Sequence, residues 1–147
     1  MTSENDPRSV TTALEKLVQA SVERSGGWLP FDRFMAQALY APRLGYYANA
    51  SRKFGRMPDS GSDFVTAPEM SPLFGQTLAV AVADALDATG CDEVWEFGAG
   101  SGALAQQLLQ ALGTRVRRYT IVEVSGALRD RQRQALAAFA DRVQWAD

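Results

Sequence analysis

The feature that most limits how this chain can fold is a run of alternating glycines at Gly98, Gly100 and Gly102. The apolar stretch Glu93–Phe97 before this run predicts a β-strand, and residues 101–112 after it carry leucines at helical spacing. Glycine permits the backbone angles of a sharp strand-to-helix turn, and it lets a ligand approach main-chain atoms with no side chain in the way. The run therefore predicts a strand, a tight turn and a helix, with a binding site at the tip of the strand.

The C-terminal part of the chain continues this alternation of strands and helices. Residues 118–124 predict a second strand, residues 126–140 a second helix and residues 143–145 the start of a third strand. This order implies a parallel sheet with right-handed crossovers. We therefore expect an α/β fold with a Rossmann-like parallel sheet over residues 91–147, and we expect Trp95 to lie in its core.

The part before residue 91 has a different organisation. We expect a disordered leader at residues 1–8 and a helical region at residues 9–90, which contains a long loop at residues 43–65 rich in glycine and basic side chains. Ser71 followed by Pro72 predicts the start of the last helix of this region. A loop of this length inside a compact domain is commonly functional.

The composition of the chain excludes several classes of function. The 147 residues include no histidine and one cysteine, which removes histidine-based triads and histidine-containing zinc sites. We expect no metal. A single cysteine cannot form an intrachain disulfide, and this favours a reducing compartment. The net charge of −2 gives no basic excess for a nucleic-acid partner, and no apolar stretch is long enough to cross a membrane.

Two carboxylates accompany the glycine run. Glu123 lies at the end of the second predicted strand, where its two oxygens could accept both ribose hydroxyls of an adenosine. Glu96 precedes Gly98 by two residues, and a carboxylate there suits the ammonium group of an amino acid better than a pyrophosphate.

Two other interpretations of the glycine run stay open. Gly98, Gly100 and Ala103 also satisfy the dinucleotide pattern, so a fragment of an NAD- or FAD-binding oxidoreductase is an alternative. The glycines could also form a tight turn with no ligand.

The motif Glu96-x-Gly98-x-Gly100-x-Gly102, followed by Glu123, resembles the cofactor motifs of class I methyltransferases. Other segments are similar to the N-terminal signature of the MidA family, which includes the mitochondrial complex I assembly methyltransferase and its bacterial relatives. These segments are Phe34-Met35, Gly45-Tyr46-Tyr47, Asp63-Phe64-Val65-Thr66, Pro68-Glu69 and Ile121-Val122-Glu123-Val124-Ser125. The resemblance covers about residues 28–136.

This resemblance implies a partial class I methyltransferase fold, S-adenosyl-L-methionine as methyl donor and an arginine side chain of a protein as substrate. The cofactor-binding residues that it implies are Thr66, Glu96, Gly98, Ala99, Gly100, Gly102, Glu123 and Val124. If the substrate is a guanidinium, carboxylates must bind and orient it, and we expect Asp63 and Glu69 to do so as catalytic residues.

Members of this family are more than twice as long as this chain, which therefore looks like the N-terminal part of one. A binding-only or inactive fragment of the methyltransferase is accordingly a further alternative. The outer edge of the first strand would be bare, so we expect a homodimer or another pairing there. The resemblance implies a location in the bacterial cytoplasm or the mitochondrial matrix, and we favour the cytoplasm.

Overall fold

The computed structural model describes residues 7–49 and 65–146 of the chain. The chain divides into two compact units, Met1–Ser51 and Arg52–Asp147. Residues 1–6 of the expected leader and residues 50–64 of the expected loop lie outside the described ranges.

The first unit contains the helices α1 (Pro7–Arg24) and α2 (Phe31–Tyr40). The buried hydroxyl of Ser21 on α1 joins them, because it donates to the carbonyl of Leu17 at 3.0 Å and accepts a hydrogen bond from Gln37 Nε2 on α2 at 3.0 Å. A polar contact therefore links these two helices.

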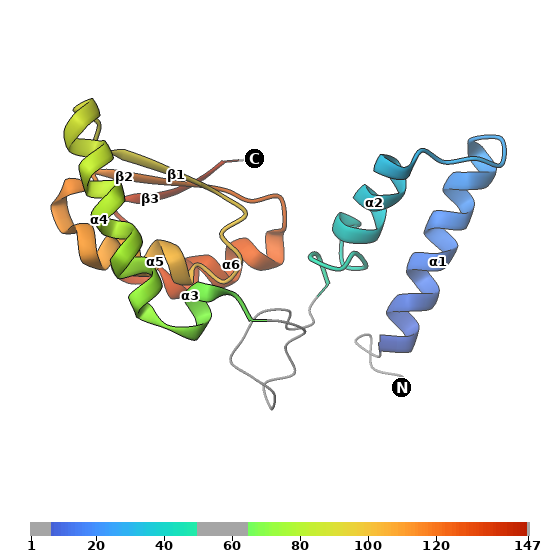
Figure 1. The fold of residues 1–147 in the computed structure, drawn as a ribbon. Coiled ribbons are helices and arrows are strands. Elements are labelled where there is room, and N and C mark those ends of the chain that lie inside the picture. Colours follow the sequence, from blue (N-terminus) through green and yellow to red (C-terminus); the bar gives the residue numbers. More distant parts are fainter. Residues whose placement is uncertain (1–6, 50–64, 147) are drawn as a thin grey trace. The chain divides into compact units, whose positions relative to one another are not determined.

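The second unit alternates helices and strands along the chain (Figure 1). Its elements are α3 (Ala67–Met70), α4 (Pro72–Thr89), β1 (Glu93–Phe97), α5 (Ala103–Leu112), the 3₁₀ turn η1 (Gly113–Arg115), β2 (Arg118–Val122), α6 (Gly126–Ala135), the 3₁₀ turn η2 (Ala137–Phe139) and β3 (Val143–Ala146). The second predicted helix thus ends at Ala135 rather than at residue 140, and a 3₁₀ turn follows it.

The three strands form one sheet in the order β1-β2-β3, and both pairs of neighbours are parallel. In this register Glu93 lies beside Arg118, and Phe97 lies beside Val122. The helices α5 and α6 lie below the sheet in Figure 1, and α4 packs on α5. The expected α/β fold with a Rossmann-like parallel sheet is confirmed. Parallel pairing also brings the carboxyl ends of β1 and β2 to the same edge of the sheet.

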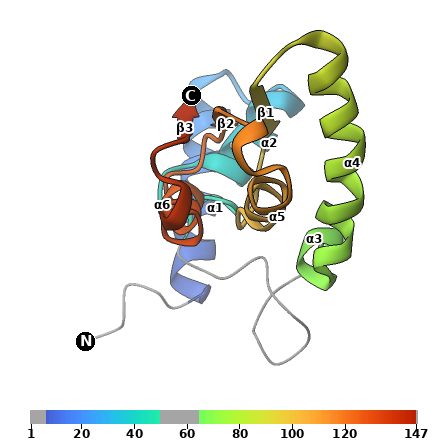
Figure 2. The same ribbon diagram turned by 90° about the vertical axis from the view of Figure 1, so that its left-hand side faces the viewer.

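The core of the second unit lies between the sheet and α5, which Figure 2 shows from the side. Leu108, Leu109 and Leu112 project from α5, and they pack with Tyr119 and Ile121 of the central strand. All five side chains are buried, so the sheet and the helix that follows the glycine run form one packed body.

The expectation that Trp95 is a core residue was wrong. Its side chain is 55% exposed, and that of Phe97 on the same face of β1 is 75% exposed. Alternation along the strand places Val94 on the face that packs against the core, so Trp95 points away from it. The strand β1 is also at the edge of the described sheet, where β2 is its one neighbouring strand.

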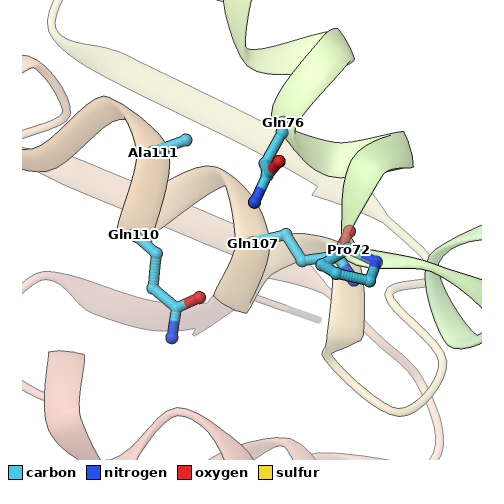
Figure 3. Close-up of a pocket in the computed structure, with 5 residues that line it drawn as sticks. All are labelled: Pro72, Gln76, Gln107, Gln110 and Ala111. Atoms are coloured by element: carbon cyan, nitrogen blue, oxygen red, sulfur yellow. The ribbon is translucent and has the colours of Figure 1, made fainter.

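The side chain of Gln107 on α5 forms hydrogen bonds to the short helix α3 and to the start of α4. Its Nε2 donates to the carbonyl of Pro68 at 2.8 Å, and its Oε1 accepts from the amide of Gly75 at 3.0 Å. A Cβ on Gly75 would lie 2.4 Å from the Gln107 side chain, so only glycine allows this approach. A pocket of about 330 Å³ lies between α4 and α5, and it is lined by Pro72, Gln76, Gln107, Gln110 and Ala111 (Figure 3). It contains none of the expected cofactor residues.

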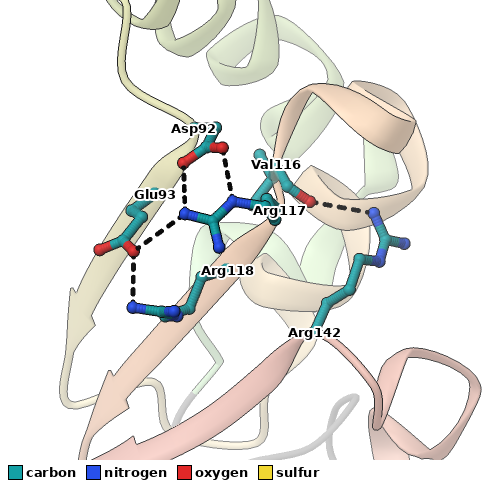
Figure 4. Close-up of polar contacts among 6 residues, drawn as sticks. All are labelled: Asp92, Glu93, Val116, Arg117, Arg118 and Arg142. Atoms are coloured by element: carbon teal, nitrogen blue, oxygen red, sulfur yellow. Dashed lines mark hydrogen bonds and ion pairs between the residues drawn. The ribbon is translucent and has the colours of Figure 1, made fainter.

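Exposed ion pairs join β1 and β2 at their amino ends, which is the edge opposite to the glycine run (Figure 4). Arg117 Nε lies 2.6 Å from Asp92 Oδ2, and Arg118 lies 2.7 Å from Glu93 Oε1. The hydrogen bond from Arg117 lowers the pKa of Asp92. Arg117 and Arg118 are therefore paired with carboxylates at the strand ends rather than forming a free basic patch, and exposed pairs of this kind contribute little to stability.

Neither a metal site nor a membrane span occurs within residues 7–49 and 65–146. No group of three or more metal-binding side chains gathers there, and no helix there has the length and apolar character needed to cross a bilayer.

Candidate functional site

The glycine run forms a tight turn between β1 and α5. Gly98, Gly100 and Gly102 have φ angles of 68°, 56° and 86°, a region that other residues rarely adopt. The amide of Gly98 donates to the carbonyl of Val122 on β2 at 2.9 Å, and the amide of Gly102 donates to the carbonyl of Ala99 at 2.8 Å. A Cβ on Gly98 would meet nothing within 4 Å, so open space lies above the turn.

Glu123 follows β2 at the same edge of the sheet. Its side chain is 5% exposed, and its two carboxylate oxygens accept hydrogen bonds from the amide of Ser125 at 2.9 Å and from Gln132 Nε2 at 3.3 Å. Ser125 caps α6 by accepting a hydrogen bond from the amide of Leu128. The carboxylate is thus fixed in direction and keeps further acceptor capacity, because a carboxylate has about four lone-pair sites.

Gln132 of α6 links Glu123 to the glycine turn. Its Nε2 donates to the Gly100 carbonyl at 3.0 Å as well as to Glu123 at 3.3 Å, so one nitrogen contacts both. The structure therefore places Glu123 beside the glycine turn.

Glu96 lies on β1 just before the turn and is half-buried. The phenol of Tyr119 on β2 donates to Glu96 Oε2 at 2.7 Å. Burial raises the pKa of Glu96, and the hydrogen bond from Tyr119 opposes that change. Burial, followed by the neighbouring Glu96 carboxylate, also raises the pKa of Tyr119, so its phenol remains a hydrogen-bond donor.

Glu69 on α3 also contacts the turn, because the Ser101 hydroxyl donates to its Oε1. Thr66 precedes α3, and its carbonyl accepts the amide of Glu69 at 2.9 Å. The structure thus brings Glu69 to the same edge as the glycine turn, with Thr66 one helical turn before it. Asp63 lies outside the described residues.

The two remaining candidates differ in how their side chains are placed. The methyl group of Ala99 is buried, so its main chain is the part that remains for a ligand. Val124 directly follows Glu123, and its side chain is 61% exposed. An apolar side chain in that position offers a surface for a flat ring.

The sequence alone did not reveal three partners of these residues: Tyr119, Ser101 and Gln132 as a link within the site. Tyr119 lies beside Val94 in the register, two residues before Glu96, so a strand alignment would have been the signal for that contact. The contacts of Ser101 and Gln132 depend on how helices pack on the sheet, and no local pattern encodes them.

These residues suit an adenosine cofactor that carries an amino acid. Open space lies beside the main chain at Gly98, and two carboxylates, those of Glu123 and Glu96, lie on the neighbouring strands near the turn. Carboxylates are the groups that accept hydrogen bonds from ribose hydroxyls and from an ammonium group. Fold and site together define a Rossmann-like domain of the class I methyltransferase type.

Comparisons with known proteins identify the family. A family model described as "Putative S-adenosyl-L-methionine-dependent methyltransferase" matches residues 77–147. The chain is 30% identical over 138 residues to the mitochondrial protein arginine methyltransferase NDUFAF7 homolog of Caenorhabditis elegans. The match covers 90% of this chain and 32% of the relative. The Drosophila melanogaster homolog is 32% identical over 103 residues, which make up 68% of this chain and 22% of the relative.

Two solved structures from Burkholderia thailandensis are also similar. One is bound to S-adenosyl-homocysteine and is 52% identical, with a TM-score of 0.86 over 97% of this chain and 39% of that chain. The other is a native structure, 47% identical, with a TM-score of 0.76 over 97% of this chain and 37% of that chain. Together these matches support a MidA-family S-adenosyl-L-methionine-dependent methyltransferase. It spans less than two fifths of the length of these relatives.

Proposed function

We propose that this chain binds S-adenosyl-L-methionine at the glycine turn and serves as the cofactor-binding part of a methyltransferase that acts on a protein arginine side chain. The observation that carries the proposal is the contact of one amide, that of Gln132, with both the Gly100 carbonyl and the Glu123 carboxylate. This contact joins the two groups that an adenosine cofactor needs at one edge of a parallel sheet.

Each cofactor-binding residue has a distinct role in this proposal. Glu123 accepts the ribose hydroxyls, and Val124 lies beside the adenine. Gly98, Ala99, Gly100 and Gly102 offer main-chain atoms at the positive end of α5, and Glu96 receives the ammonium group. Thr66 bounds the site before α3. When bound, the cofactor supplies a methyl group on a sulfonium.

The arginine substrate rests on the names of the curated relatives, which are protein arginine methyltransferases. We propose that Glu69, and Asp63 in the preceding segment, bind and orient the guanidinium. The hydrogen bond from Ser101 supports this role for Glu69, because it fixes the carboxylate beside the turn. Positioning of the acceptor nitrogen in line with the sulfonium methyl group is the main task in such a transfer.

Calorimetry with S-adenosylmethionine, S-adenosylhomocysteine and NAD tests the cofactor. We expect both adenosyl ligands to bind and NAD to give no heat. Binding of NAD alone would establish the oxidoreductase alternative instead. The absence of binding by all three ligands would overturn the proposed site.

Transfer of a labelled methyl group to arginine-containing peptides tests the substrate. With the methyltransferase that contains this chain we expect incorporation into arginine, and we expect Glu69→Gln to abolish turnover while S-adenosylhomocysteine affinity is retained. Unchanged turnover in that variant would remove Glu69 from the proposal. Tight S-adenosylhomocysteine binding without any transfer would establish the binding-only alternative.

A cytoplasmic location is part of the proposal, although the curated relatives are named as mitochondrial. Fractionation of cells that express the native protein, followed by detection with an antibody, tests the location. Recovery in a mitochondrial fraction would overturn it.

A further inference from the structure

Gln132 is a completely buried polar side chain on a helix whose other described side chains are at least partly exposed. Every polar atom of its side chain has a partner on a different segment. Nε2 donates to Gly100 at 3.0 Å and to Glu123 at 3.3 Å, and Oε1 accepts from Trp145 Nε1 on β3 at 2.9 Å. A buried amide with full hydrogen bonding has one arrangement in which all partners are satisfied.

The contact with Trp145 determines which way the amide of Gln132 faces. An indole N–H is a donor only, so it must meet the oxygen of the amide and cannot be satisfied by the nitrogen. Rotation of the amide by half a turn would place the oxygen against the Gly100 carbonyl and the Glu123 carboxylate, which are both acceptors. β3 therefore fixes the amide with its N–H groups toward the site.

We infer that Gln132 is a positioning residue for the cofactor, which holds the ribose-binding carboxylate and the glycine turn in one fixed relation. The inference rests on the proposed function, because it assumes that Glu123 and the turn bind the two ends of one ligand. Without this amide, Glu123 loses a hydrogen-bond donor, and the Gly100 carbonyl loses its buried partner.

The test is S-adenosylhomocysteine affinity, measured by calorimetry, together with the melting temperature of the ligand-free protein. Gln132→Met keeps a similar volume and removes all three hydrogen bonds, and we expect its affinity to fall by about ten-fold or more. Gln134→Met, at an exposed glutamine of the same helix, is the matched control and should keep wild-type affinity. A folded Gln132→Met variant with wild-type affinity would overturn the inference.

Two further variants separate positioning from a merely structural role. Trp145→Phe keeps an aromatic ring and frees the amide to rotate, so we expect a loss of a few-fold in affinity with the fold intact. In Gln132→Glu a carboxylate would face Glu123, and only its protonated form can donate. Protonation of Glu96 weakens ammonium binding in wild type and variant alike, so the two proteins are compared at each pH. The affinity of the variant relative to that of wild type should rise as the pH falls.

The outcomes distinguish this inference from the proposed function. If wild type binds S-adenosylhomocysteine and the ratio of Gln132→Glu affinity to wild-type affinity does not change with pH, the positioning role is wrong while the cofactor site stands. If wild type does not bind it, both are wrong. Should Gln132→Met fail to fold, Trp145→Phe and Gln132→Glu decide the matter, and wild-type affinity in both at every pH overturns the inference.

Discussion

At the scale of single residues, Glu123 combines burial with a carboxylate that already accepts two hydrogen bonds. In Glu123→Gln, an amide nitrogen would meet the donors of Ser125 or Gln132, and the charged acceptor for ribose would be lost. Hydrogen bonds to charged groups contribute about 1.5–3 kcal/mol, so S-adenosylhomocysteine affinity should fall by about ten-fold or more. Calorimetry checks this, with the exposed Asp130→Asn on α6 as the control that keeps wild-type affinity.

Glu96 gives a prediction about the pH dependence of stability. Burial raises its pKa in the folded protein above the ordinary value of 4.5. The folded state therefore favours the protonated carboxyl, and its contribution to stability is present below pH 4.5 and is lost as the pH rises through the folded pKa.

In Glu96→Gln this loss should disappear, so the melting temperature should decline less than that of wild type between pH 4.5 and neutrality. Thermal melts across this range measure the difference. Glu15→Gln, on the exposed face of α1, serves as the control with the wild-type slope. Identical slopes for Glu96→Gln and wild type would show that the carboxyl is not desolvated.

At the scale of elements, the turn between β1 and α5 depends on backbone angles that side chains resist. Gly102 has φ of 86°, and a Cβ there would make ordinary contacts at 3.6 Å with Gln132 and Leu136. Strain rather than collision should therefore set the cost of Gly102→Ala, at about 1–2 kcal/mol of unfolding free energy.

Urea unfolding measures that cost, and Gly126→Ala is the matched control. Gly126 is the first residue of α6, has no left-handed angle and has open space around it. Alanine there should be neutral or stabilise by up to about 1 kcal/mol. Equal effects of the two variants would contradict the role given to the turn.

The elements themselves followed from local patterns, whereas contacts between them did not. Glycine spacing, leucine periodicity and the Ser71-Pro72 pair predicted the turn, α5 and the start of α4 close to where they occur. The link from Gln132 to Glu123 was not predictable, because it depends on where α6 lies on the sheet. The exposure of Trp95 was missed because hydrophobic character alone does not tell which face of a strand is covered.

At the scale of the whole molecule, the described sheet ends at β1, and that strand carries two exposed aromatic side chains. An edge strand with apolar side chains is a template for pairing with another chain. We expect the purified chain to self-associate at this edge, and light scattering coupled to size-exclusion chromatography measures it. Trp95→Lys should shift the population toward monomer, whereas Trp28→Lys, at an exposed tryptophan of the first unit, should not. A monodisperse wild-type monomer would contradict this expectation.

Trp145 gives the protein an internal optical reporter. Its indole nitrogen donates to the amide that touches both Gly100 and Glu123, so a nucleoside arriving there would alter the polarity around the ring and shift its emission. The other two tryptophans, Trp28 and Trp95, are exposed, and iodide in solution would quench their emission first. Fluorescence recorded in iodide should therefore follow ligand occupancy without any attached dye.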